Sequence, residues 1–158
     1  MYLRRFYFII LVYANLKMEY DTKDKTFWKR KGNDMKVLLG AVNAKYIHSN
    51  LAVFNLKACA KEYDSNVVLR EYTINQQKDD ILKDIYRCHP DVICISCYIW
   101  NISYALDLVR DIHKVLPDAD IWLGGPEVSY DAKKVLTREP DVRGIMRGEG
   151  ELTFTELV

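Results

Sequence analysis

The chain has 158 residues, a length that suits one domain large enough to bury a sizeable core. Apolar residues make up 49% of it and charged residues 28%, which is the balance of a globular protein. The formal net charge of +1 provides no basic excess, which excludes nucleic-acid binding through a broad electrostatic footprint.

The first 34 residues differ in character from the rest. Arg4 and Arg5 precede an apolar run over residues 6–14, which is shorter than the roughly 20 residues that cross a bilayer. We therefore predict an N-terminal extension over 1–34, disordered or upstream of the native start, and a cytoplasmic domain over 35–158 without a stable membrane span. The alternatives are a membrane-associating leader and an extra strand or helix on the sheet.

The first half of the domain alternates strand and helix patterns. The apolar run over 36–42 predicts a buried strand, and Ser49 or Asn50 can cap the helix that follows. The expected apolar face of that helix comprises Leu51, Phe54, Leu56, Ala58 and Cys59. The β-branched residues over 67–74 indicate a strand nearer an edge, and residues 78–88 a second helix.

The second half continues in the same way. The run over 92–98 is the most apolar in the chain and predicts a central strand. Gly124-Gly125-Pro126 closes the strand after it. The remaining elements are expected as strands over 119–123 and 142–146, and as helices over 101–115, 129–137 and from 152 onward.

Strands that alternate with helices of this length predict an α/β fold with a doubly wound, mainly parallel five-stranded sheet. In such folds ligands bind outside the carboxyl ends of the strands, where the strand order reverses. The loops over 43–50, 96–101, 124–128 and 147–151 would then share one face. Polar residues and glycines gather in these loops, which predicts a ligand site there.

The loop after the first strand carries Asn43, Tyr46 and His48, which supply an amide, a phenol and an imidazole. His48 is a candidate metal ligand or hydrogen-bond donor, although a lone His also serves as a helix cap or a surface residue.

Two aromatic residues follow the third strand. Small Ser96 at the strand end would let a large flat ligand approach, with Tyr98 and Trp100 as apolar walls. The equally weighted alternative is that both rings cover the core or the next helix. Nearby Cys94 and Cys97 form a C-x-x-C pair inside an apolar run, which favours buried strand cysteines over a redox dithiol or a metal pair.

Glycines mark the last two loops. Gly124 and Gly125 remove two side chains from the ligand face, or simply form a tight turn before Pro126. A large side chain at Gly125 is expected to block a ligand and to leave the fold intact. Gly148 and Glu149 lie at a helix start that could bind an anion, although the acidic residues there oppose a phosphate. The sequence has no G-x-G-x-x-G and no Walker loop.

Four strings stand at the predicted strand ends, namely NAKYIHSNLA, ISCYIWN, LGGPEVSYDA and IMRGEGELTF. Together they resemble the amino-terminal cobalamin-binding domain of cobalamin-dependent radical S-adenosylmethionine proteins, over residues 35–158. The resemblance implies a flavodoxin-like or Rossmann-like fold with cobalamin as the cofactor. The candidate cofactor-binding residues are Asn43, Tyr46, His48, Ser96, Tyr98, Trp100, Gly124, Gly125, Pro126, Gly148 and Glu149.

The resemblance also assigns roles. It implies that Ser96 faces the dimethylbenzimidazole tail of cobalamin and that Gly124-Gly125 lets the tail pass the strand. The wider family has a D-x-H-x-x-G loop whose histidine ligates cobalt. His48 lies in the corresponding loop and is the candidate metal ligand, but Tyr46 stands where the Asp would be and the glycine is missing.

The sequence lacks the C-x-x-x-C-x-x-C trio that holds a radical S-adenosylmethionine cluster. The string over 148–151 resembles the family's link into its catalytic barrel. The resemblance therefore implies a fragment that does not catalyse alone, with the iron–sulfur cluster and S-adenosylmethionine in a missing barrel or a separate barrel chain. The alternatives are a degenerate flavodoxin-like interaction domain without cofactor and a flavin carrier, although the loop over 43–50 has no glycine for a phosphate.

Overall fold

The structure is a computed structural model that describes residues 18–20, 35–44 and 49–158. One sheet of six strands has the order β1-β6-β5-β4-β2-β3. The strands are β1 (Met18–Tyr20), β2 (Val37–Asn43), β3 (Val67–Thr73), β4 (Val92–Ser96), β5 (Asp120–Gly124) and β6 (Val142–Met146). None of the helices within the described ranges is long and apolar enough to cross a membrane.

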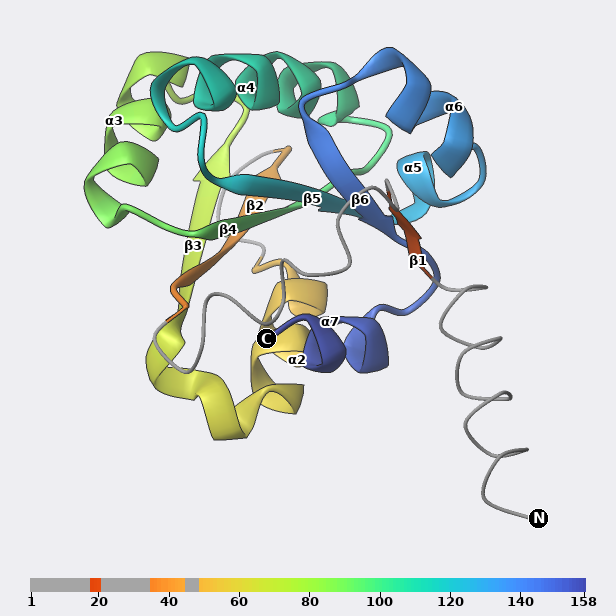
Figure 1. Cartoon of the computed structure of the whole chain (residues 1–158). Coiled ribbons are helices and arrows are strands. Elements are labelled where there is room, and N and C mark those ends of the chain that lie inside the picture. The colour runs from red at the N-terminus through yellow and green to blue at the C-terminus, as the bar shows by residue number, and fades with distance from the viewer. Residues whose placement is uncertain (1–17, 21–34, 45–48) are drawn as a thin grey trace, which may run out of the picture.

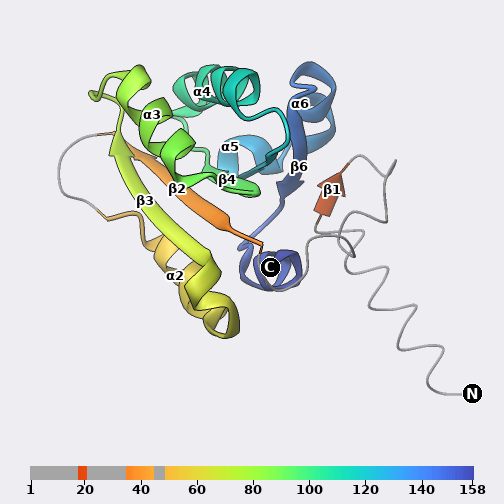
Figure 2. The same cartoon turned by 60° about the vertical axis from the view of Figure 1, so that its left-hand side comes forward.

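Strands β2 to β6 are parallel to one another, and the short β1 pairs antiparallel with β6. Counted from β2, the parallel strands have the order 2-1-3-4-5, which is the flavodoxin-like arrangement. The predicted five-stranded parallel sheet is confirmed, with β4 central and β3 at an edge. Figure 2 shows β3 and β1 at opposite edges of the sheet.

Helices cover both faces of the sheet, as predicted. Helices α3, α4, α5 and α6 lie on one face, and α2 and α7 lie on the other (Figure 1). The bounds are α2 (Leu51–Cys59), 3-10 helix η3 (Lys61–Asn66), α3 (Lys78–Cys88), α4 (Ile102–Val115), α5 (Pro126–Ser129), α6 (Ala132–Arg138) and α7 (Glu151–Leu157).

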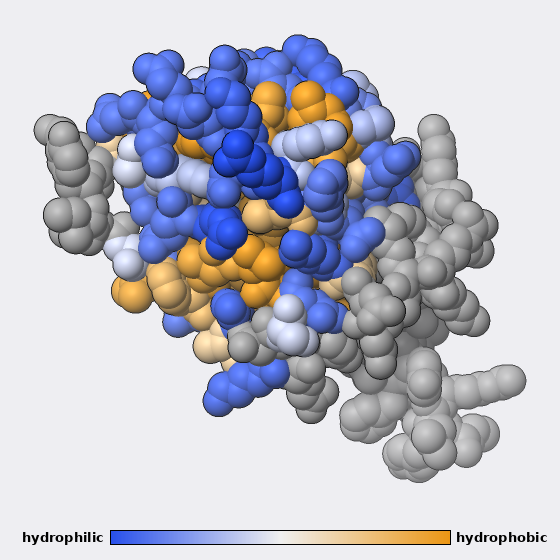
Figure 3. Space-filling model, turned by 90° about the vertical axis from the view of Figure 1, so that its left-hand side faces the viewer, coloured by the Kyte–Doolittle hydropathy of each residue, from blue (hydrophilic) through white to orange (hydrophobic). Residues whose placement is uncertain are grey.

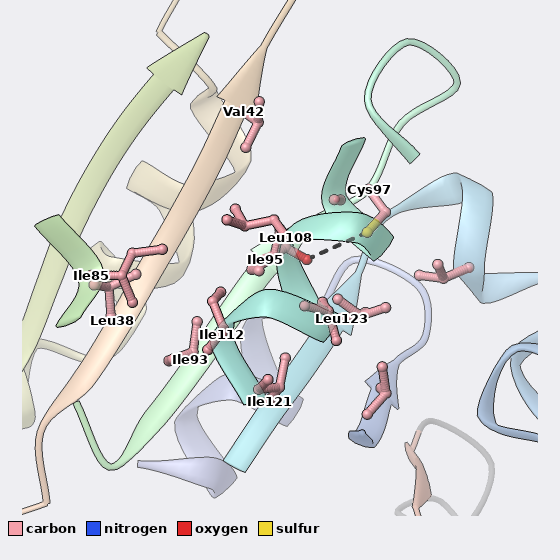
Figure 4. Close-up of a cluster of buried hydrophobic side chains, with 14 of the residues drawn as sticks. Leu38, Val42, Ile85, Ile93, Ile95, Cys97, Leu108, Ile112, Ile121 and Leu123 are labelled. Atoms are coloured by element: carbon pink, nitrogen blue, oxygen red, sulfur yellow. Dashed lines mark hydrogen bonds between the residues drawn. The ribbon is translucent and has the colours of Figure 1, made fainter. Parts of the chain in front are cut away.

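The core has two layers because side chains of a strand alternate between the faces of the sheet. Ile93 and Ile95 of β4 face the α3/α4 side, and Cys94 between them faces the α2/α7 side. Figure 4 shows Ile93, Ile95 and neighbouring strand residues packed against Leu108 and Ile112 of α4. Burial of this apolar surface is the main stabilising contribution to the fold.

Two predictions about helices were wrong. The segment expected as one helix over 129–137 is divided into α5 and α6, because Pro126 starts a helix directly after Gly125 and the backbone leaves helical geometry at Asp131 (φ −113°, ψ 36°). In α2 the buried residue is Val53, whereas Leu51 and Phe54 are exposed. The apolar residues of α2 are spread around the helix, so the sequence pattern could not identify the face that packs against the sheet.

The surface on the β3 side is mostly hydrophilic, with an apolar area near the centre of the view (Figure 3).

Strand β4 ends at Ser96, two residues before its predicted end. The Cys97 N–H donates to the Gly124 carbonyl and the Tyr98 N–H to the Asn101 side chain, so the chain turns away from β2.

Candidate cofactor site

A cavity of about 660 Å³ opens at the carboxyl ends of β4, β5 and β6, where the sequence predicted a ligand site. This volume lies in the range of small-molecule and cofactor sites, roughly 300–1,000 Å³. The cavity is lined by Leu39, Ala52, Val53, Leu56, Cys94, Ile95, Ser96, Tyr98, Leu123, Gly124, Gly125, Pro126, Ser129, Tyr130, Met146, Arg147, Gly148, Glu149 and Gly150.

The inner part of the cavity is an apolar slot between the sheet and α2. Leu39, Cys94 and Met146 belong to the strand side chains of the α2/α7 layer, and Val53 and Leu56 come from α2. By their sequence pattern these residues are expected to be ordinary core. The slot could not be found from the sequence, because an apolar strand residue has the same pattern whether a helix or a ligand covers it.

The two glycines at the end of β5 open the cavity in different ways. A Cβ at Gly124 would lie 3.7 Å from the Met146 Cβ, which is an ordinary contact beside the open slot. Gly125 has φ +106° and ψ 172°, and a Cβ there would collide with the Cys97 carbonyl oxygen. Gly125 is therefore required by the backbone, and the expectation that a large side chain there leaves the fold intact was wrong.

Ser96 lines the cavity at the carboxyl end of β4. Its Oγ accepts a hydrogen bond of 3.1 Å from Asn50 Nδ2, and the Asn50 Oδ1 accepts from the Ala52 N–H and caps α2. The Glu71 carboxylate accepts from the Asn50 N–H and from Asn43 Nδ2. Asn43 at the end of β2 therefore shares the Glu71 carboxylate of β3 with Asn50 and is not among the residues that line the cavity, so its contact with a cofactor stays a prediction.

Asn101 fixes the loop that follows β4. This side chain is completely buried, and its amide group donates to the carbonyls of Val42 and Ser96, both at 2.9 Å. Its oxygen accepts from the Tyr98 N–H at 2.7 Å. One amide thus joins the carboxyl ends of β2 and β4. The sequence does not distinguish this role, because a single Asn after a strand is also a common helix cap.

Tyr98 and Trp100 form a stacked pair with ring centroids 4.6 Å apart and planes 4° apart. Tyr98 lines the cavity, whereas Trp100 stands behind it and is 48% exposed. The structure therefore places Tyr98 at the cavity and Trp100 beside Tyr98, and the contact of either ring with a cofactor stays a prediction.

The loop after β6 closes one side of the cavity with Gly148, Glu149 and Arg147. Arg147 Nε donates to the Ser129 carbonyl at 3.2 Å, which ties this loop to the end of α5. Arg147, Ser129 and Tyr130 also line the cavity and were not among the predicted site residues. Arg147 directly follows β6, which was the available signal, whereas Ser129 ends α5 and Tyr130 follows that helix.

Of the predicted cofactor-binding residues, the structure brings Ser96, Tyr98, Gly124, Gly125, Pro126, Gly148 and Glu149 to this one cavity. Tyr46 and His48 lie outside the described residues, so ligation of cobalt by His48 stays a prediction. Within the described ranges, His, Cys, Asp and Glu side chains form no group of three that could hold a metal ion.

Cys94 and Cys97 are buried free thiols, as predicted. Burial raises the pKa of both, and that of Cys97 reaches about 12, with Glu127 adding to the shift. A thiol with such a pKa is not ionised near neutral pH, which makes a redox dithiol or a metal pair the weaker interpretation.

A flavodoxin-like sheet with an apolar slot and a serine at its carboxyl edge defines a cofactor-binding α/β module. The model of the B12 binding domain family matches residues 36–158. The chain therefore belongs to this family, whose cofactor is cobalamin, and the resemblance read from the four loops is confirmed.

Curated relatives agree with this assignment. The chain is 35% identical over 69 residues to the 2-(S-pantetheinyl)-carbapenam-3-carboxylate methyltransferase of Streptantibioticus cattleyicolor and 32% identical over 69 residues to the cobalamin-dependent radical SAM methyltransferase TokK of Streptomyces tokunonensis. Both matches cover 44% of this chain and 10% of the relative. A third relative is the hopanoid C-3 methylase of Methylococcus capsulatus, at 34% identity over 81 residues, covering 50% of this chain and 16% of the relative.

Solved structures share the fold. The cobalamin-dependent S-adenosylmethionine radical enzyme OxsB, with aqua-cobalamin and S-adenosylmethionine bound, superposes with a TM-score of 0.64 at 15% identity, over 87% of this chain and 21% of OxsB. A cobalamin-binding protein from Desulfitobacterium hafniense gives a TM-score of 0.52 at 16% identity, over 80% of this chain and 60% of that protein. The chain thus spans about a fifth of the length of OxsB and 10–16% of the length of these three curated relatives.

Proposed function

We propose that this domain holds cobalamin at the carboxyl edge of its sheet and presents it to a radical S-adenosylmethionine barrel that transfers methyl groups. The observation that carries the proposal is the slot between the sheet and α2, with Ser96 and Gly124 lining the same cavity at the ends of β4 and β5. The family match and the three methyl-transferring relatives support it.

The residues present fit one part of cobalamin well. A flat, largely apolar heteroaromatic tail suits a slot lined by Leu39, Leu56 and Met146. The absence of a side chain at Gly124 leaves room beside β5, and the Ser96 hydroxyl can form a hydrogen bond to a ring nitrogen. In this proposal the tail enters the slot, and Tyr98, Gly148 and Glu149 contact the part of the cofactor that stays nearer the opening.

The bound cofactor supplies the chemistry of a methyl carrier or radical partner. The residues of this chain bind and orient it and exclude water from its tail. The iron–sulfur cluster and S-adenosylmethionine belong, in this proposal, to a barrel on the same polypeptide or on a separate chain.

The proposal also includes the domain boundary and the cellular setting. The unit begins near Met35, which is buried and stands one residue before the family match. A cytoplasmic setting suits the buried free thiols of Cys94 and Cys97, because thiols persist in a reducing compartment.

The test is a titration of the purified chain with hydroxocobalamin, followed by desalting and a visible spectrum. We expect retention of one cobalamin per chain. A folded chain, shown by circular dichroism, that retains none would contradict the proposal and favour the degenerate interaction domain.

A further inference from the structure

The hydrogen bond between Asn50 and Ser96 joins residues 46 positions apart in the sequence. Asn50 is the N-cap of α2, and Ser96 ends β4 and lines the cavity. The cap of one helix therefore touches the hydroxyl group that the site presents from the end of β4.

The orientation of the Asn50 amide is fixed by the helix. The Ala52 N–H can only donate, so the Asn50 atom that faces it at 3.1 Å must be the carbonyl oxygen. The NH₂ group must then point to Ser96 Oγ, also at 3.1 Å. A second anchor holds the same residue, because the Asn50 N–H donates to Glu71 Oε1 at 2.8 Å.

A hydroxyl has one proton and two lone pairs. Since Asn50 donates to Ser96, the serine accepts that bond with a lone pair and keeps its own proton for another acceptor. Among the described residues no hydrogen bond takes this proton, and Ser96 lines the cavity.

We infer that Asn50 is a positioning residue that makes Ser96 a hydrogen-bond donor toward the cavity. The site then selects a ligand group with an acceptor and no proton at that point, which a ring nitrogen of the benzimidazole tail provides. This inference rests on the proposed function and adds a determinant of specificity to it.

The test variant is Asn50→Asp. Aspartate still caps α2 through an oxygen, but its carboxylate can only accept, so Ser96 must donate to it and can no longer donate to the ligand. We expect cobalamin to bind roughly three- to tenfold more weakly, the effect of one lost neutral hydrogen bond. Cobinamide, which lacks the nucleotide tail, should bind to the variant as it does to the unmodified chain.

Two further variants separate this effect from charge and from folding. Asn50→Ser keeps a capping oxygen and adds no charge beside Glu71. This variant should also weaken the binding of cobalamin and leave the binding of cobinamide unchanged. Ser96→Ala should weaken cobalamin binding to the same extent as Asn50→Asp. The double variant should bind cobalamin no more weakly than Ser96→Ala alone.

Equal losses for cobalamin and cobinamide, or additive losses in the double variant, would overturn the inference and leave the proposed function standing. Failure of the unmodified chain to bind either ligand would overturn both. Melting curves of each variant establish that the binding data come from folded protein, and Asn50→Ser provides the result if Asn50→Asp does not fold.

Discussion

Gly124 and Gly125 are adjacent at the end of β5, but only Gly125 has a backbone conformation that excludes other residues. Its φ of +106° with ψ of 172° is essentially confined to glycine, and the Cys97 backbone lies against it. Gly124 belongs to the strand and has ordinary contacts. The pair therefore combines a requirement of the fold with a candidate requirement of the cofactor.

This difference predicts opposite phenotypes for two variants. Gly124→Leu fills the slot and should abolish cobalamin retention, with a change in the free energy of unfolding of about 1 kcal/mol or less. Gly125→Ala should destabilise the fold by roughly 1–3 kcal/mol or more, because it adds backbone strain and a clash. Urea unfolding and the hydroxocobalamin titration measure the two effects. Unchanged cobalamin binding by folded Gly124→Leu would remove Gly124 from the site.

At the scale of elements, Asn101 connects β2, β4 and the start of α4. Its three hydrogen bonds satisfy two strand-end carbonyls and the Tyr98 N–H inside the protein. The Arg110–Glu139 ion pair similarly connects α4 to the end of α6, with N–O distances of 3.1 and 2.6 Å. Glu139 is buried and Arg110 is about half exposed, so loss of the arginine would leave a buried carboxylate without its partner.

We predict that Asn101→Ala costs about 2–4 kcal/mol of unfolding free energy, since it leaves several buried polar groups without partners. The matched control is Asn75→Ala, which removes the same amide from an exposed turn and should change stability by about 0.5 kcal/mol or less. Urea denaturation of both variants is the measurement. Equal midpoints for the two would show that the contacts of Asn101 do not stabilise the strand ends.

For the molecule as a whole, buried ionisable groups predict how stability depends on pH. Burial, and next a hydrogen bond to Asp84 at 2.8 Å, raise the pKa of Tyr72 well above its ordinary value. Burial likewise raises the pKa of Cys94 and Cys97. The folded protein keeps these protons at a pH where the unfolded chain has lost them, so stability is complete below the unfolded pKa values and falls above them.

The prediction is a free energy of unfolding that falls as the pH rises above about 9, since the unfolded thiol and phenol ionise at roughly 8.5 and 10. In Tyr72→Phe the free energy of unfolding should fall less steeply above pH 10. The slope should be smaller by up to about 1.4 kcal/mol per pH unit, which is the contribution of one proton. Urea unfolding of both proteins at several pH values between 7 and 11 provides the curves. Parallel curves for the two proteins would contradict the assignment to Tyr72.

The sequence determined which segments of the chain form the parallel strands and most of the helices, because alternation with period 2 or 3.6 is a local property of the chain. It also placed Ser96, Gly124 and Gly148 at one edge, since the carboxyl ends of parallel strands meet there. Their part in cofactor binding is still a prediction.

Only the tertiary structure decided what lies between these residues. Packing of α2 on the sheet creates the slot under Leu56, and strand order brings Asn50 to Ser96 and Asn101 to Val42 across 46 and 59 residues. It also separates Trp100 and Asn43 from the cavity. The physical reason is that such contacts depend on which strands are neighbours and on which face of an all-round apolar helix packs, and neither is encoded in a local pattern.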